Sequence, residues 1–120
     1  MTQVSLRIDL GPAARIGPGK VRLLELIAEH GSISAAGRAL GMSYRRAWML
    51  VADLNRVLAH PVVEGQAGGP GGGGASLTPL GADLVRRYRA VERAALAAAE
   101  AQMAALALLG EEPPPGSPPP

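Results

Sequence analysis

Two glycines, Gly31 and Gly41, break the middle of this 120-residue chain into short helical segments. Between them, Ser34 is placed to cap a helix over residues 35–40, which Gly41 then ends. Directly after this second glycine, Ser43 is placed to cap a longer helix. A short helix, a tight turn and a longer helix in this order predict a helix-turn-helix.

The longer helix, expected over residues 43–58, has two different faces. Its apolar face carries, at helical spacing, Ala47, Trp48, Val51, Leu54 and Leu58. Its other face shows Arg45, Met49, Ala52 and Arg56. Because Trp48 belongs to the apolar face, we expect it in the core rather than stacked on a nucleic-acid base.

In a helix-turn-helix, the N-terminal part of the second helix enters the major groove of DNA. The residues that this places at the groove are Ser43, Tyr44, Arg45 and Arg46. Arginine suits the position because its guanidinium can contact guanine O6 and N7 together, and free N–H groups of the first turn can hold a phosphate. For Tyr44 we favour DNA contact over packing on the preceding helix. Ser34 and Met49 complete the candidate DNA-contacting residues of the two helices.

Six glycines occupy the seven positions from Gly68 to Gly74. A phosphate-binding loop of the NTPase type needs a lysine and a hydroxyl directly after its last glycine, but Ala75 follows here. The segments on either side are too short for the run to link two domains. Val62 and Val63 before the run and Leu77 after it indicate strand ends. We therefore expect a hairpin with a flexible tip, and a loop without a role is the alternative.

A hairpin in this place corresponds to the wing of a winged helix, which follows the phosphate backbone or the minor groove. Glycines let main-chain N–H groups approach a phosphate without an intervening side chain. The candidate wing contacts are Gly68, Gly69, Gly71, Gly72, Gly73 and Gly74.

The two ends of the chain predict one strand and one long helix. Strict alternation of apolar and polar residues over Val4–Leu10 indicates a half-buried strand. Thr78 and Pro79 are placed as the cap and the first residue of a helix that runs to about Leu109. A heptad-like seam along this helix consists of Leu84, Tyr88, Val91, Ala95, Ala98, Gln102, Ala105 and Leu109.

The last helix also carries a basic cluster. Its members are Arg86, Arg87, Arg89 and Arg93. We favour a solvated face paired with Asp83 or Glu92 over contact with phosphate.

Composition and charge exclude several classes of function. The chain has no cysteine, which excludes disulfides, thiolate metal sites and cysteine nucleophiles. Residues 31–52 hold three arginines and no acid, although the formal net charge is only +2, and this local excess favours an anionic partner. We recognise no signal peptide and no apolar run of membrane-spanning length, so we expect a cytoplasmic protein. His30 and His60 are isolated, and we expect no metal, no cofactor and no enzymatic activity.

Four ordered motifs resemble the DNA-binding domain of the ModE family of molybdate-responsive transcription regulators. They are GSIS at 31–34, GMSYRRAW at 41–48, GGPGGGG at 68–74 and LTPLG at 77–81. The general frame is also similar to LysR-type DNA-binding domains. The resemblance covers roughly residues 4–93. It implies a winged helix that binds an inverted repeat as a dimer, held largely by the terminal helices, and it matches Ser43–Arg46 to the recognition segment and the glycine run to the wing.

On this basis we expect a mainly α protein with a small β wing, forming one domain over residues 1–110. We expect a dimerisation helix over about 79–109 and a disordered proline-rich tail over 111–120. The expected dimer interface consists of Leu84, Tyr88, Val91, Ala95 and Ala98. Full-length family members append oxyanion-binding domains that this chain does not reach, so we expect a stand-alone form and leave molybdate binding open.

The sequence differs from the family pattern at two wing positions, and two alternative functions are also considered. Gly65 and Pro70 stand where the family's wing often carries basic residues, so the wing is expected to hold phosphate more weakly. One alternative function is a protein-interaction module that works through the alanine-rich last helix. The other is an oxyanion-binding regulator that holds its anion between subunits.

Overall fold

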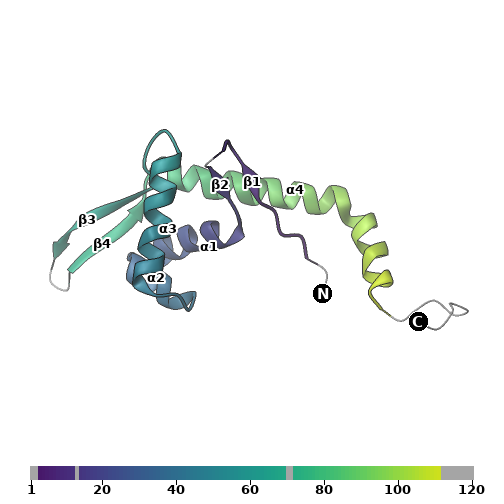
Figure 1. Cartoon of the computed structure of the whole chain (residues 1–120), viewed down its shortest axis with the longest axis horizontal. Helices are drawn as coiled ribbons and strands as arrows, with labels where there is room; N and C mark the ends of the chain where they lie inside the picture. The colour runs from purple at the N-terminus through teal and green to yellow at the C-terminus, as the bar shows by residue number, and fades with distance from the viewer. Residues whose placement is uncertain (1–2, 13, 70–71, 112–120) are drawn as a thin grey trace, which may run out of the picture.

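The computed structural model describes residues 3–12, 14–69 and 72–111 of the chain. Within these ranges it forms four helices and two two-stranded antiparallel sheets, one of which extends to the left in Figure 1. The elements are β1 (Ile8–Asp9), β2 (Arg15–Ile16), α1 (Pro18–His30), α2 (Ile33–Ala39), α3 (Tyr44–Val57), β3 (Val63–Gly69), β4 (Gly72–Leu77) and α4 (Pro79–Leu109). The predicted fold class is confirmed, and residues 112–120 of the tail predicted at 111–120 lie outside the described ranges.

The N-terminal strand is shorter than its alternating pattern predicts. Only the two residues of β1 pair, because the partner strand β2 is itself two residues long before the chain turns into α1. The preceding residues contact α4 instead, where the carbonyl of Leu6 accepts a 2.6 Å hydrogen bond from the hydroxyl of Tyr88. Leu10, the last apolar residue of the pattern, is 56% exposed.

The first helix of the helix-turn-helix begins two residues earlier than predicted, and its cap is Ser32 rather than Ser34. The Oγ of Ser32 accepts a 3.0 Å hydrogen bond from the N–H of Ala35. The reason is Gly31, whose left-handed backbone (φ 75°) ends α1 and leaves the next residue extended, as a cap requires. Ser34 lies in the first turn of α2, where its hydroxyl accepts a 3.4 Å hydrogen bond from Arg38.

The helices α2 and α3 cross closely at Gly37. A β-carbon there would lie 3.0 Å from the β-carbon of Ala47, so a larger residue would push the two helices apart. Leu40 and Met42 pack against the core beside this crossing. Gly41 makes the turn between the helices with φ 69°, a conformation that other residues rarely adopt.

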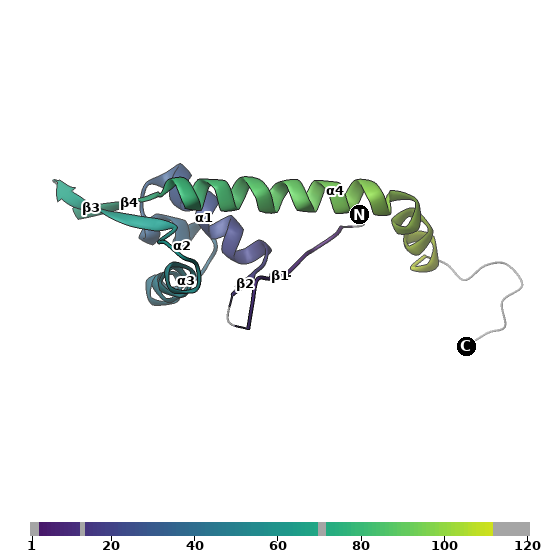
Figure 2. The same cartoon turned by 90° about the horizontal axis from the view of Figure 1, so that it is seen from above.

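The helix α4 begins and ends where predicted, with Thr78 as its cap and Pro79 as its first residue. Its first half packs on the body of the domain, whereas its second half projects away from the body (Figure 2). No helix in the described part of the chain combines the length and the apolar character needed to cross a membrane.

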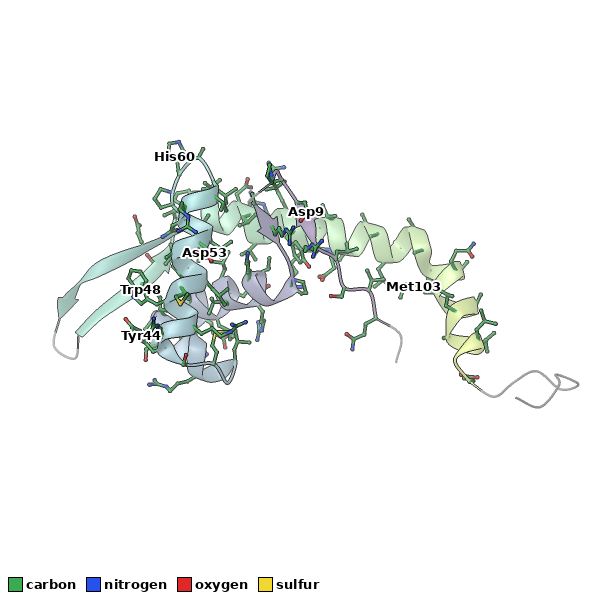
Figure 3. The ribbon with its side chains drawn as sticks, viewed as in Figure 1. Asp9, Tyr44, Trp48, Asp53, His60 and Met103 are labelled. Atoms are coloured by element: carbon green, nitrogen blue, oxygen red, sulfur yellow. The ribbon has the colours of Figure 1, made fainter. Side chains whose placement is uncertain are left out.

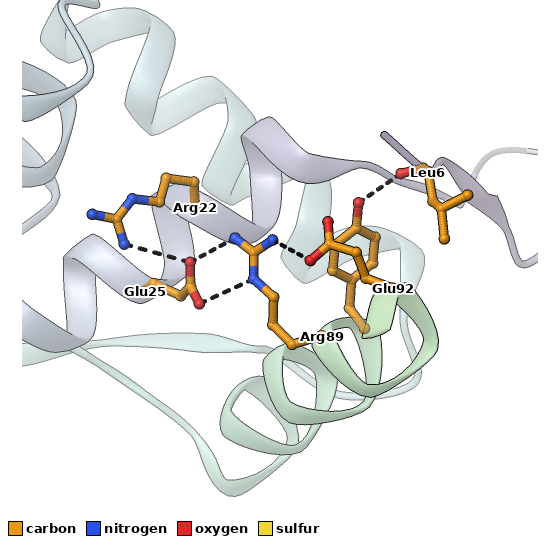
Figure 4. A network of polar contacts seen from close by, with 6 residues as sticks. Leu6, Arg22, Glu25, Arg89 and Glu92 are labelled. Carbon is orange, nitrogen blue, oxygen red and sulfur yellow. Dashed lines mark hydrogen bonds and ion pairs between the residues drawn. The ribbon is translucent and has the colours of Figure 1, made fainter. Parts of the chain in front are cut away.

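Arg89 joins α4 to α1. Its guanidinium donates hydrogen bonds of 2.8 and 3.2 Å to the carboxylate of Glu25 and a third of 2.8 Å to Glu92 (Figure 4). The hydrogen bond from Arg89 lowers the pKa of the Glu25 carboxyl, although partial burial acts in the opposite direction. Next to this pair, Tyr88 is only 2% exposed, and burial raises the pKa of its hydroxyl. A bidentate ion pair fixes the orientation of the two side chains as well as their distance, so α4 is held in one position on α1.

The basic cluster of α4 is largely the paired, solvated face that we favoured. Arg86 and Arg87 both bond to Asp83, and the Nε of Arg87 lies 2.7 Å from the carboxylate. Arg89 forms ion pairs with Glu25 and Glu92. Arg93 makes no hydrogen bond or ion pair within the described residues.

Gly81 brings the first turn of α4 against the start of the wing. A β-carbon at this position would lie 2.1 Å from the carbonyl oxygen of Val62, closer than real atoms approach. The same carbonyl accepts a 3.0 Å hydrogen bond from the N–H of Thr78, and the hydroxyl of Thr78 donates a 2.7 Å bond to Pro61. The wing is therefore docked directly on the backbone of α4.

The first prediction concerns this contact. Gly81→Ala should lower the free energy of unfolding by about 1–3 kcal/mol, because the added methyl group overpacks a backbone junction. Gly19→Ala is the matched control, since Gly19 also lies in the first turn of a helix but has nothing within 4 Å of the added carbon. Urea unfolding followed by circular dichroism measures both, and equal stability of the two variants would contradict the predicted role of Gly81.

Candidate nucleic-acid interface

The N-terminus of α3 is exposed and well formed. Ser43 caps it as predicted, with its Oγ accepting a 3.1 Å hydrogen bond from the N–H of Arg46. The side chains of Tyr44, Arg45 and Arg46 are all exposed. The first turn therefore presents two cations and the positive end of the helix dipole to solvent.

Most basic side chains elsewhere in the chain are already paired with carboxylates. Of the twelve basic residues, seven have such a partner: Arg7, Arg15, Arg22, Arg56, Arg86, Arg87 and Arg89. Within the described residues, the five without one are Lys20, Arg38, Arg45, Arg46 and Arg93. Three of these five lie on α2 and α3, so the positive charge available to a ligand is concentrated on the helix-turn-helix.

The prediction that Trp48 is a core residue is wrong, because the side chain is 50% exposed. The buried side of α3 consists of Ala47, Val51 and Leu54, and this stripe is narrower than the sequence pattern indicates. Trp48 lies at the edge of the stripe and extends from α3 on the same side as Tyr44 (Figure 3).

Two further large side chains of α3 are exposed. Tyr44 is 57% exposed and Met49 is 58% exposed, so neither packs back onto the domain. The outer surface of α3 near its N-terminus therefore combines two arginines with three large side chains that can make apolar contacts.

A groove of about 740 Å³ separates α3 from the wing. We call it the α3–wing groove. It is lined from three elements: the start of α2, the exposed flank of α3 and the base of the wing. The lining residues are Ser32, Ile33, Ser34, Tyr44, Trp48, Val51, Ala52, Asn55, Arg56, Val63, Gly65 and Gly74.

The predicted hairpin is confirmed. Its strands β3 and β4 pair from Val63 opposite Leu77 to Gly69 opposite Gly72, with a register shift between Gln66 and Gly69. Of the six candidate wing glycines, five lie in these strands and Gly71 lies outside the described residues. The hairpin reaches outward beside α3 (Figure 1), which is the position of a wing in a winged helix.

Asn55 fixes the wing relative to α3, and the sequence analysis missed it. Its side-chain oxygen accepts hydrogen bonds from the N–H groups of Val62 at 2.8 Å and Val63 at 3.1 Å. Its side-chain nitrogen donates a 3.1 Å bond to the carbonyl of Val63. One polar residue on α3 thus satisfies three backbone groups at the start of β3. No local signal identifies such a partner, because the bonds span seven and eight residues.

The predicted seam of α4 divides into two parts. Tyr88 is buried within its own chain and Leu84 packs against both core clusters. Val91 is 47% exposed, Ala98 is exposed, and Ala95 is half-buried. The part of the seam from Val91 onward is therefore the part most open to a partner.

The geometry defines a winged helix-turn-helix of the DNA-binding type, with a capped recognition helix, unpaired arginines at its start and a glycine-rich hairpin beside it. The chain matches the family of bacterial regulatory helix-turn-helix proteins of the lysR family over residues 19–82. The chain therefore belongs to this family.

Relatives agree with the resemblance seen in the four motifs. The chain is 51% identical over 79 residues to the molybdenum-pterin-binding protein MopB of Rhodobacter capsulatus, covering 66% of this chain and 29% of the relative. It is 38% identical over 92 residues to the molybdenum transport protein ModE of Azotobacter vinelandii, covering 77% and 33%. It is 37% identical over 86 residues to the DNA-binding transcriptional dual regulator ModE of Escherichia coli K12, covering 72% and 33%. The predicted ModE resemblance is confirmed, and the chain spans about a third of the length of these curated relatives.

The matched family consists of regulators, in agreement with the expectation that the chain is not an enzyme. Within the described residues, no three His, Asp or Glu side chains gather as a metal site would require.

The second prediction tests how the wing is positioned. Asn55→Ala should lower the free energy of unfolding by about 1–3 kcal/mol, because buried backbone groups lose their partner. Hydrogen exchange at the amides of Val62 and Val63 should accelerate more than exchange in α1. Asn55→Asp keeps the two accepted bonds and should retain most of the protection of those amides. Unchanged exchange in the alanine variant would contradict the role assigned to Asn55.

Proposed function

We propose that this chain binds an inverted repeat in double-stranded DNA as a homodimer and regulates transcription there. One observation carries the proposal: the exposed, capped N-terminus of α3 carries two arginines without acidic partners, in a chain whose other basic residues are mostly paired. Arginine at this end of a recognition helix can read guanine or clamp a phosphate. A chromosomal target also implies a cytoplasmic location.

The wing supplies the second contact with DNA. Its outer part is rich in glycine, so main-chain N–H groups can approach the phosphate backbone beside the groove that receives α3. Ser34 and Met49 extend the contact surface on α2 and α3. The junction at Asn55 sets the distance between these two contacts.

Dimerisation is supported by apolar surface that the single chain leaves uncovered. Beyond Arg89, α4 exposes the seam residues Val91 and Leu109, at 47% and 75%. An apolar groove of about 350 Å³ lies where the N-terminal hairpin meets α4 and includes Leu10 and Val91. Exposed apolar patches of this kind mark association surfaces. A twofold dimer presents two recognition helices and therefore selects an inverted repeat.

The names of the relatives concern molybdenum transport, molybdenum-pterin binding and transcriptional regulation. We propose that this chain controls genes of molybdenum or oxyanion metabolism. Direct binding of molybdate would raise the melting temperature of the protein, which a titration with molybdate and with sulfate as control would detect.

The third prediction concerns DNA binding. Genomic fragments selected by the purified full chain near physiological salt should share an inverted repeat. Arg45→Ala and Arg46→Ala should each weaken binding to the selected duplex by about 1–3 kcal/mol, the usual worth of an arginine contact with a base. Arg86→Ala is the control, since Arg86 is paired with Asp83 on α4. Two arginine variants with wild-type affinity would rule out the assigned site, whereas a lack of any shared sequence would rule out the function.

The fourth prediction concerns the dimer. Val91→Arg should convert the protein to a monomer in sedimentation experiments and reduce affinity for the inverted repeat. Leu96→Arg is matched to it, because Leu96 is equally exposed on α4 but lies off the seam. If Leu96→Arg dissociated the dimer and Val91→Arg left it intact, the interface would lie on another face of the helix than predicted.

A further inference from the structure

Trp48 has no structural role that explains an exposed indole. Half of its surface is open to solvent, and the core beneath it is closed by Ala47, Val51 and Leu54. Its side chain makes no hydrogen bond within the described residues. Together with Tyr44 and Met49, which are 57% and 58% exposed, Trp48 makes an exposed apolar patch of the kind that marks a binding surface.

The surroundings of Trp48 form one side of the α3–wing groove. Tyr44, four residues earlier on α3, lies on the same side of the helix, and both aromatic side chains line this flank of the groove (Figure 3). The opposite wall comes from the wing, where Gly65 and Gly74 carry no side chains. A β-carbon at Gly65 would meet only the carbonyl oxygen of Gly74, at 4.0 Å. There is thus room for a side chain at Gly65, and glycine leaves the groove in front of Trp48 wide.

The charge around the groove indicates what occupies it. Arg45 and Arg46 follow Tyr44 in the first turn of α3 and are exposed, so a polyanion bound at this turn lies next to the end of the groove that Tyr44 lines. Arg56, at the far end of the groove, is neutralised by Asp53. DNA fits this distribution, because its charged backbone meets the arginines while its base edges reach the apolar flank.

We infer that Trp48 is a specificity-determining residue that packs against the C5 methyl group of a thymine in the major groove. The thymine methyl is the apolar group that base edges present there, and apolar side chains are its natural partners. The inference rests on the proposed function, since it requires α3 to enter the major groove. It adds that recognition depends on a methyl group as well as on the hydrogen bonds of the arginines.

Replacement of single thymines by deoxyuridine tests the contact, because it removes the methyl group and keeps the base-pairing edge. The duplex selected from genomic fragments is prepared with each thymine replaced in turn. For the wild-type chain, replacement at one thymine position in each half of the inverted repeat should lower the affinity for the duplex about fourfold. This factor corresponds to ~0.8 kcal/mol for one buried methyl-sized group. In Trp48→Ala the same replacement should have no effect on affinity.

Two controls keep the outcome clear. Met49→Ala removes an equally exposed side chain of α3 and should retain the sensitivity to deoxyuridine at the Trp48 position. Trp48 is the sole tryptophan of the chain, so its fluorescence reports directly on this site, and it should change on binding in the wild type and in Met49→Ala.

The possible results separate the two ideas. Sequence-selective binding with no deoxyuridine-sensitive thymine, or with sensitivity that persists in Trp48→Ala, would overturn the Trp48 contact and leave the proposed function standing. Failure to select any shared sequence would contradict both the Trp48 contact and the proposed function. Circular dichroism of Trp48→Ala should match the wild type, because the side chain is half exposed.

Discussion

The backbone of Val62 is the point at which the recognition helix, the wing and the long helix meet. Its N–H is bound by Asn55 of α3, and its carbonyl accepts a hydrogen bond from Thr78 and lies against Gly81 of α4. The side chain of Val62 is fully buried in the same place. Buried backbone groups are costly to leave unpaired, so these contacts admit few alternative arrangements. The distance between α3 and the wing follows from the contacts of this one residue, and in the complex that we propose it would decide whether both elements reach DNA together.

Charge pairing complements this junction. Arg89 forms ion pairs with Glu25 and Glu92. Asp83 forms ion pairs with two other arginines of α4, Arg86 and Arg87. These pairs leave little free positive charge on the helix that supports the domain. The arginines at the start of α3 keep theirs, together with the positive end of the helix. The chain thus has a modest formal net charge of +2 and still keeps unpaired positive charge at the start of α3.

Local signals predicted most of the fold, and non-local contacts account for the differences. The caps at Ser43 and Thr78 and the end of α4 are short-range features, and the structure has them where expected. The cap of α2 was misplaced because two serines compete and the conformation of Gly31 decides between them. Trp48 was misassigned because periodicity gives the direction of a side chain but not the width of the core that faces it. The bonds of Asn55 to the wing join separate elements and have no counterpart in a local pattern.

The helix α4 divides its length between two tasks. Up to Arg89 its contacts lie within the chain, since Gly81 meets the wing, Tyr88 holds the N-terminal segment through Leu6, and Arg89 binds α1. Beyond this point its apolar residues face solvent. In the dimer that we propose, the second half would join the two chains while the first half holds each DNA-binding body. Because one continuous helix connects the two, the separation of the recognition helices, and with it the spacing of the half-sites, would be set by the docking of Arg89 and Gly81 rather than by a flexible linker.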